Sequence, residues 1–390
     1  MYRRFFVAFG RIFYSFSGAF RAIMPEKGKD MRRLYIANGS DAKEMARLLL
    51  ESAQPEAGIS KEAKIVLKPN LVVAKGWKSG ATTNPAVCEA CIEYFFERGF
   101  KNVSIVESSW LGCDTARAFR VCGYEELSKK YGVELVDVKK DKYEPREFGG
   151  FKTEISKRAL EADCIINLPL IKGHCQTKVT CALKNLKGLI PDGEKRRFHS
   201  MGLHKPIACL GAMLRPALTI ADGIYTDPGF EEGGNPRRMD VMIAGIDNVL
   251  VDAYAAGLLG YSPYDIEYIA LAEQAGVGSA DVDKAEIINI SGDRQQIQSV
   301  KSDDMETAKA HIEERDACSA CYANLLSALM QLGEQHDLGD TKVCVGQGFK
   351  GKSGEIGSGD CTAGFARCIK GCPPSAQDIK QELTAIRRNA

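Results

Sequence analysis

The stretch Cys164-Ile-Ile-Asn-Leu-Pro-Leu-Ile-Lys-Gly-His174 decides the fold that we expect for this chain. Its first five residues form a short, almost continuous apolar run, which is typical of a strand buried on both faces of a sheet. The proline that follows favours the end of such a strand, because proline lacks the N–H that a sheet requires. A lysine and a histidine then come within six residues of the strand end.

Runs of the same kind recur at 65–68, 103–107, 133–138, 218–221, 241–244 and 287–290. Helical periodicity extends between them over 42–51, 85–98, 123–131, 247–260 and 266–275. Strand followed by helix, repeated, predicts an α/β fold with a mostly parallel sheet covered by helices on both faces. We therefore expect a leader at 1–30, an α/β domain at 31–300 and a small cysteine-rich metal-cluster domain at 301–390.

Polar residues follow four of the expected strands. They are Lys68 with Asn70, Glu107, the segment 167–174, and Asp222. Ligands of such sheets bind beyond the carboxyl ends of the strands, so we predict that these residues surround one crevice and bind substrate. Each of them alone is also typical of a solvated turn.

The segment 172–205 contains eight lysines and arginines and only two acidic residues. A small molecule with phosphate or carboxylate groups is the natural ligand of such a segment. We predict Lys172, His174 and Lys184 as catalytic residues, the histidine exchanging a proton and the lysines stabilising negative charge. Asn185 and His199 complete the predicted substrate site. A solvated basic loop is the alternative interpretation.

Several segments together resemble the family called domain of unknown function 362. These are Lys68-Pro-Asn-Leu71, Thr83 with Pro85, 168–174, 181–188, Asp222-Gly223 and Val251-Asp-Ala253. The resemblance covers nearly the whole chain after the leader, and it implies that an iron–sulfur module accompanies the α/β domain. The reaction of this family is generally unknown, so the resemblance implies architecture rather than activity.

A second, local resemblance concerns the order and spacing of His174, Lys184 and His199, which is similar to that in nickel-pincer lactate racemases. The resemblance implies an acid/base role for His174, attachment of a nickel nucleotide at Lys184, and a metal-ligand role for His199. The sequence departs from that pattern, because Ala-Leu precedes Lys184 where a pair of glycines is expected. This departure argues against a nickel nucleotide as the cofactor.

Six cysteines lie near the C-terminus. Gly371-Cys372-Pro-Pro374 resembles the ligand loop found in small subunits of respiratory complexes and hydrogenases, which implies a [4Fe-4S] cluster rather than zinc. The expected ligands are Cys318, Cys321, Cys361 and Cys372, with Cys368 as an alternative to Cys361. Cys344, in an expected strand, is interpreted as a packed thiol. A structural zinc site is the alternative, since four thiolates also suit zinc.

The composition bounds the remaining possibilities. The chain has 390 residues, 14 cysteines and a formal net charge of +1, so it is expected to be an ordinary globular protein of a reducing compartment, placed in the cytoplasm. This balance gives no indication of nucleic acid as a partner. No Gly-x-Gly-x-x-Gly fingerprint follows an expected strand, so NAD is not indicated.

Residues 1–24 combine phenylalanines at three- and four-residue steps with arginines on the opposite helical face. This pattern predicts an amphipathic basic helix that contacts an anionic membrane surface or a partner, which would make the protein peripheral to a membrane. Two other interpretations stay open: the helix packs on its own domain, or translation starts at Met31.

The sequence as a whole predicts an oxidoreductase. A [4Fe-4S] cluster would deliver single electrons to an anionic small molecule in the basic crevice, and a ferredoxin or flavoprotein would supply those electrons. One alternative is a noncatalytic electron carrier or assembly component. Another is a non-redox acid/base or nickel-dependent enzyme in which the cysteines hold a structural metal.

Overall fold

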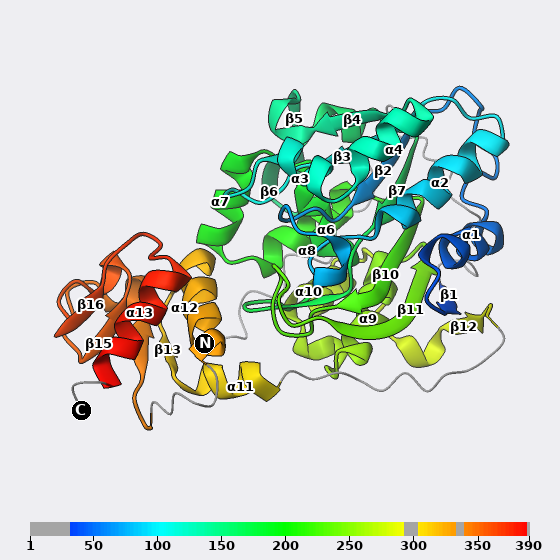
Figure 1. The fold of residues 1–390 in the computed structure, drawn as a ribbon. Helices are drawn as coiled ribbons and strands as arrows, with labels where there is room; N and C mark the ends of the chain where they lie inside the picture. The colour runs from blue at the N-terminus through cyan, green and yellow to red at the C-terminus, as the bar shows by residue number, and fades with distance from the viewer. Residues whose placement is uncertain (1–31, 292–302, 333–338, 388–390) are drawn as a thin grey trace.

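The computed structural model describes residues 32–291, 303–332 and 339–387 (Figure 1). The amphipathic helix predicted for residues 1–24 lies outside these ranges. Within them, no helix is long and apolar enough to cross a membrane.

The α/β domain is built on an eight-stranded sheet with the order β12-β1-β11-β10-β7-β2-β3-β4. Its strands are β1 (Arg33–Asn38), β2 (Ile65–Pro69), β3 (Val103–Glu107), β4 (Glu134–Asp137), β7 (Cys164–Leu168), β10 (Leu218–Thr226), β11 (Arg237–Gly245) and β12 (Glu286–Asn289). Only the pairs formed by β11 are antiparallel, and the neighbours from β10 to β4 are all parallel. The predicted mostly parallel sheet is confirmed.

Helices cover both faces of this sheet (Figure 1). One face packs against α1 (Ala42–Ala53), α2 (Pro85–Glu97), α3 (Thr115–Val121) and α4 (Tyr124–Tyr131). The other packs against α6 (Ala182–Asn185), α7 (Asp192–Met201), α8 (His204–Met213), α9 (Asn248–Leu258) and α10 (Glu267–Gln274). Strand β2 shows why its run is continuously apolar, since Ile65 and Leu67 enter one core and Val66 the other.

Two smaller hairpins extend from the sheet. The first consists of β5 (Tyr143–Phe148) and β6 (Phe151–Ser156), which the short helix α5 (Lys157–Leu160) follows. The second consists of β8 (Lys172–His174) and β9 (Lys178–Thr180), which pair antiparallel and lead into α6. The predicted catalytic residues Lys172 and His174 therefore lie on a hairpin that projects beyond the end of β7.

The structure corrects the predicted end of one strand. The sequence predicts a strand that ends at Ala221, with Asp222-Gly223 directly after it, but β10 continues to Thr226 and pairs with a β11 that is longer than predicted. The carboxylate of Asp222 accepts hydrogen bonds from the backbone N–H groups of Asn84 and Ile224, so it is satisfied inside the strand. The loop that leaves this edge of the sheet consequently starts after Thr226.

The C-terminal residues form a small cysteine-rich domain. Its sheet contains four parallel strands, β13 (Ile312–Glu314), β14 (Val343–Val345), β15 (Ile356–Ser358) and β16 (Arg367–Ile369). Its helices are α11 (Asp303–Ala310), α12 (Ser319–Leu332) and α13 (Ala376–Arg387). The core of this domain also includes Cys175, from the β8–β9 hairpin, so the hairpin packs against the C-terminal domain.

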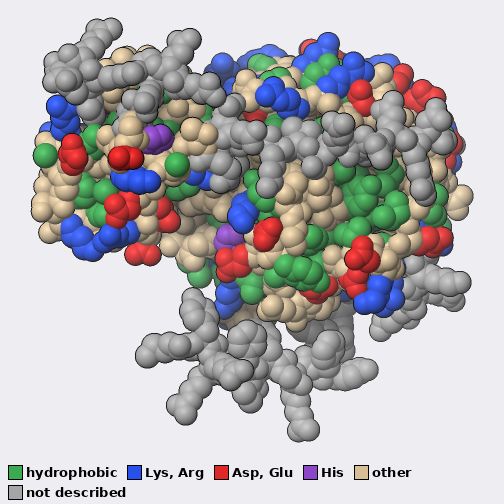
Figure 2. Space-filling model, turned by 90° about the horizontal axis from the view of Figure 1, so that it is seen from below, with side chains coloured by type: hydrophobic (Ala, Val, Ile, Leu, Met, Phe, Trp, Pro, Cys, Tyr) green, Lys and Arg blue, Asp and Glu red, His purple; other side chains and the backbone are tan. Residues whose placement is uncertain are grey.

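Charge is mixed on the molecular surface that Figure 2 presents. Basic and acidic side chains alternate there over both domains. The described residues visible on this face therefore form no extended basic surface of the kind that binds nucleic acid.

Candidate functional site

The four strand ends that the sequence singles out belong to four adjacent strands, in the order β10-β7-β2-β3. A cavity of about 470 Å³ lies beside them. The α/β domain contributes Asn70, Glu107, Lys172, His174, Lys184, Asn185, Lys187, Lys195, His199, Glu231 and Glu232 to its lining. The C-terminal domain contributes Cys318, Cys321, Ala323, Asn324, Cys372 and Pro373. The cavity is therefore a site between the two domains.

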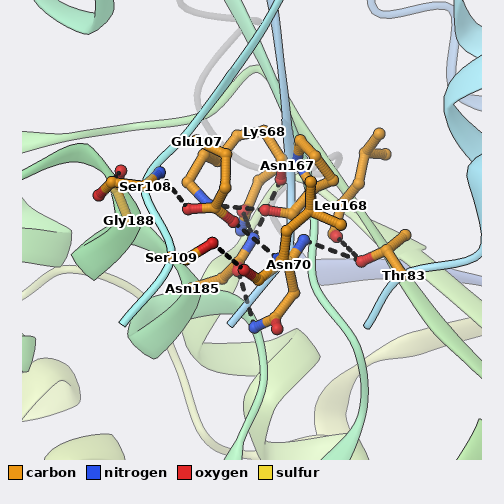
Figure 3. A network of polar contacts seen from close by, with 12 residues as sticks. Lys68, Asn70, Thr83, Glu107, Ser108, Ser109, Asn167, Leu168, Asn185 and Gly188 are labelled. Atoms are coloured by element: carbon orange, nitrogen blue, oxygen red, sulfur yellow. Dashed lines mark hydrogen bonds and ion pairs between the residues drawn. The ribbon is translucent and has the colours of Figure 1, made fainter. Parts of the chain in front are cut away.

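A buried ion pair forms the floor of the site (Figure 3). Lys68 Nζ lies 2.8 Å from Glu107 Oε2, and both side chains are almost fully buried. The backbone N–H groups of Leu71 and Ser108 also donate to the Glu107 carboxylate, which leaves neither oxygen without a partner. Gly188 packs directly over this pair, since a Cβ there would overlap the Glu107 carboxylate and lie 2.6 Å from Lys68 Nζ.

Three asparagines connect the floor to the cavity wall (Figure 3). Asn70 Nδ2 donates to Asn185 Oδ1 at 3.1 Å. Asn185 Nδ2 in turn donates to Asn167 Oδ1 at 2.8 Å and to the Lys68 carbonyl at 3.0 Å. The short helix α6 that carries Asn185 is held at its start by Asp252, whose carboxylate accepts from the backbone N–H groups of residues 182 and 183. This network fixes α6, and with it Lys184, against the strand ends.

Two of the cavity lysines are occupied by protein acceptors. Lys172 Nζ donates to Asn70 Oδ1 and to the carbonyl oxygens of Ala81 and Glu231. Burial and, to a smaller extent, repulsion from Lys184 lower the pKa of Lys172 to about 7. Lys195 likewise donates to oxygens of residues 108, 109 and 192. These two lysines position the loops around the cavity rather than offer free N–H groups to a ligand.

Lys184 and Lys187 are less occupied. Among the described residues, Lys184 Nζ has one hydrogen-bond acceptor, Thr180 Oγ1 at 2.9 Å, and Lys187 Nζ contacts His199 Nε2 at 3.2 Å. Burial lowers the pKa of Lys184 to about 8, and Glu231 opposes this shift by attraction. Burial and the positive charge of Lys187 lower the pKa of His199 to about 2, so this imidazole is neutral. Amino groups with spare N–H donors therefore face the cavity, and burial together with repulsion from Lys184 lowers the pKa of Lys187 well below its usual value.

His174 is oriented by its own hairpin and by Glu231. Its Nδ1 accepts from the backbone N–H groups of Gln176 and Thr177, so the proton of the neutral imidazole is on Nε2, which lies 3.3 Å from Glu231 Oε1. Burial, followed by repulsion from Lys184, holds the pKa of His174 well below its usual value. His174 is thus a neutral donor to Glu231 and not a free base.

The side chains of His174, Cys175 and Glu231 also form the only described group with three potential metal-ligating atoms within 4.8 Å of one another. Metal ligation by Nε2 would require moving the imidazole proton to Nδ1, where it would meet two backbone N–H groups. Cys175 Sγ lies 3.6 Å from Glu231 Oε1, and burial raises the pKa of this thiol well above its usual value. The group fits a hydrogen-bonded proton donor set better than a metal ion.

The four predicted cysteine ligands lie within electrostatic reach of one another. Burial and, to a smaller extent, the neighbouring thiols of Cys318, Cys372 and Cys361 raise the pKa of Cys321 to about 12. Cys318, Cys321 and Cys372 line the cavity, whereas Cys361 is not part of its lining. The alternative ligand, Cys368, is turned toward Gly359 O, 3.6 Å from its Sγ.

The distances between the cysteine sulfurs bear on which metal group these thiols could bind. Among the described residues, no three of these sulfurs lie within 4.8 Å of one another. Four thiolates on one zinc ion, at Zn–S distances of about 2.3 Å, sit closer than that. A four-iron cluster holds its thiolates further apart, because each binds a different iron atom. The described sulfurs are therefore spaced more widely than thiolates on a single zinc ion.

Most of the predicted site residues share the cavity. Lys172, His174, Lys184, Asn70, Glu107, Asn185 and His199 all line it. Lys68 and Asp222 do not, since both are buried behind the lining and hold Glu107 and the backbone in place. Sequence reasoning missed Glu231, in the loop after β10. The available signal was the acidic pair Glu231-Glu232 inside the glycine-rich segment 228–234.

Comparison with known proteins gives one curated relative. A thylakoid-associated protein of Synechocystis is 29% identical to this chain over 222 residues, which cover 55% of this chain and 68% of that protein. Among solved structures, the lactate racemase apoprotein of Thermoanaerobacterium thermosaccharolyticum shows a weak similarity, with a TM-score of 0.33 and 15% identity. That match covers 56% of this chain and 55% of the racemase.

A family model matches the part of the chain that builds most of the site. It begins at the first residue of β2 and ends within α9, so it includes the strand ends, the β8–β9 hairpin and α6. Residues 65–257 match the model described as "Domain of unknown function (DUF362)", so the predicted resemblance to this family is confirmed for that segment.

Proposed function

We propose that this protein is an iron–sulfur oxidoreductase that reduces an anionic small molecule in the cavity between its two domains. The observation that carries the proposal is the composition of this cavity. The α/β domain contributes Lys184 and Lys187 to its lining, and the C-terminal domain contributes Cys318, Cys321 and Cys372. A ligand bound to the lysines would thus lie beside the cysteine set.

Cys318, Cys321, Cys361 and Cys372 would hold the cluster. Their spacing and the proline-bounded loop of Cys372 support a [4Fe-4S] cluster over zinc. When bound, such a cluster supplies single electrons, which we expect to come from a ferredoxin or a flavoprotein.

The residues of the α/β domain would bind the substrate and manage its charge. Lys184 and Lys187 would bind the anionic group and stabilise the negative charge that a received electron adds. Because its pKa is about 8, Lys184 is also able to release a proton to the reduced substrate near neutral pH. The pair of His174 and Glu231 would orient the substrate beside Lys184.

The shared cavity also favours an enzyme over a noncatalytic electron carrier. A carrier requires no small-molecule site, whereas His174 and Lys184 converge here on a cavity of about 470 Å³. This volume lies within the range of small-molecule sites.

We also propose that the protein works at a membrane surface as a peripheral protein. Two observations support this location: the amphipathic pattern of residues 1–24 and the thylakoid-associated name of the Synechocystis relative.

The proposal is tested by anaerobic purification, metal analysis and electron paramagnetic resonance of the dithionite-reduced protein. We expect about four iron atoms per chain and a cluster signal. Inorganic phosphate should perturb this signal, and the perturbation should be absent in Lys184→Met. One zinc atom per chain without iron would contradict the redox proposal. A cluster signal that no anion perturbs would favour the electron carrier.

A further inference from the structure

The cavity contains a carboxylate, Glu231, one oxygen of which has no assigned partner among the described residues. Glu231 Oε1 lies near two donors, His174 Nε2 at 3.3 Å and Cys175 Sγ at 3.6 Å. Glu231 Oε2 is buried and has no hydrogen-bond partner in the described part of the chain. An unpaired buried carboxylate oxygen is unfavourable, so it indicates a missing partner.

We propose that the ligand of this cavity is a hydroxylated anion, whose charged group binds Lys184 and Lys187 and whose hydroxyl donates to Glu231 Oε2. This inference rests on the proposed function and specifies its substrate class.

The anionic group is assigned from the donors that remain free. Within the described residues, Lys184 Nζ has only Thr180 as an acceptor, and Lys187 Nζ contacts only His199. In either protonation state each amino group keeps at least one N–H group beyond these contacts, so together they leave donors for one phosphate or carboxylate. Lys172 and Lys195 are excluded as primary anion ligands, because protein oxygens already occupy their donors.

Glu231 is held in place to receive the second group. Its backbone carbonyl accepts from Lys172 Nζ at 2.8 Å, and Asp227 holds the start of the loop by accepting from the backbone N–H groups of residues 229, 230 and 235. The side chain itself is only 16% exposed.

The second group is a hydroxyl rather than an ammonium for an electrostatic reason. Glu231 already attracts both Lys172 and Lys184. A third positive charge at Oε2 would meet these two lysines in a buried site, where repulsion is poorly screened. A neutral hydroxyl donates the same hydrogen bond without that repulsion.

The test compares a matched pair of probes, glycerol 3-phosphate and propyl phosphate, by isothermal titration of the full chain as purified anaerobically. Because a hydrogen bond to a charged acceptor contributes about 1.5–3 kcal/mol, we expect the hydroxylated probe to bind about tenfold or more tightly. In Glu231→Gln, Oε2 is replaced by an amide N–H, and the preference should fall below about threefold. Glu232→Gln, in the same loop and cavity, is the matched control and should keep the preference.

Equal binding of both probes to the unmodified protein, or an unchanged preference in Glu231→Gln, would overturn the hydroxyl assignment alone. Failure of both probes to bind would overturn the anion site and with it the substrate class of the proposed function. Heat of binding requires no electron donor, so a failed redox assay leaves this inference testable on its own.

Discussion

Lys68 Nζ and Glu107 Oε2 lie 2.8 Å apart, with side-chain exposures of 0% and 4%, at the ends of the adjacent strands β2 and β3. A buried ion pair of this kind adds little net stability, but removing one partner leaves an unpaired charge in a medium of low polarity. The pair therefore makes the floor of the cavity sensitive to substitution.

We expect Lys68→Met to lower the free energy of unfolding by about 3–5 kcal/mol, because it leaves the buried Glu107 carboxylate without its charge partner. Urea unfolding followed by circular dichroism measures this change. The double variant with Glu107→Gln should recover part of the loss. Lys64→Met, which breaks an exposed pair with Glu161, is the control and should change stability by less than about 1 kcal/mol. Equal effects at the two lysines would contradict the buried-pair interpretation.

Gly188 is expected to tolerate no side chain. A Cβ there overlaps Glu107 and approaches Lys68, so Gly188→Ala should cost about 1–3 kcal/mol through displacement of the ion pair and should weaken anion binding. Gly193→Ala is a close control, because a Cβ at that position meets nothing within 4 Å. Thermal unfolding measures the stability of both variants, and phosphate titration measures their anion affinity. Equal stability and equal affinity of the two variants would refute this expectation.

Replacing Lys184 should raise the stability of the protein and remove its anion binding. Burial disfavours its charged form, so Lys184→Met is expected to stabilise the ligand-free protein by about 1–3 kcal/mol at pH 7 and to abolish phosphate binding. The folded chain releases the Lys184 proton at about pH 8, whereas the unfolded chain keeps it to about pH 10.5. Stability of the unsubstituted protein therefore rises across this window, and the advantage of the variant should shrink. A constant advantage between pH 7 and 10 would speak against a buried ammonium.

Anion affinity should depend on pH through the same group. Above pH 8, where Lys184 loses its proton, the affinity for propyl phosphate should fall by up to about tenfold per pH unit. Titration calorimetry between pH 7 and 10 measures this decline. An affinity that stays level across the range would assign the anion to another cation.

Iron content should separate the cysteines into two groups. Four single substitutions should each lower the iron content per chain after anaerobic purification, because each removes a cluster ligand. They are Cys318→Ser, Cys321→Ser, Cys361→Ser and Cys372→Ser. Cys368→Ser should retain iron, since Cys368 Sγ lies beside Thr362 Oγ1 and Gly359 O, each at 3.6 Å. Cys344→Ser should do the same, because its thiol lies beside Glu313. Loss of iron in Cys368→Ser but not in Cys361→Ser would exchange their roles.

Local patterns carried most of the fold prediction. The strands at 103–107 and 164–168 have the predicted bounds, because a strand buried on both faces requires an unbroken apolar run wherever it lies in the chain. The same reasoning failed at Asp222-Gly223, where local propensity favours a turn but hydrogen bonds from Asn84 and Ile224 keep Asp222 within β10. The donor at Asn84 lies far away in the chain, so no local pattern reports it.

The sequence by itself determined the mostly parallel sheet, the polar strand ends and the residue types of the site, because periodicity and strand ends are properties of neighbouring residues. Only the tertiary structure decided which lysines stay free, since that depends on acceptors from distant loops that reach Lys172 and Lys195 but leave Lys184 with one partner. It also decided that Glu231 lies beside His174 and that Cys318, Cys321 and Cys372 close the same cavity. Such contacts arise from the packing of distant loops within the α/β domain and of the two domains against each other, which no spacing along the chain encodes.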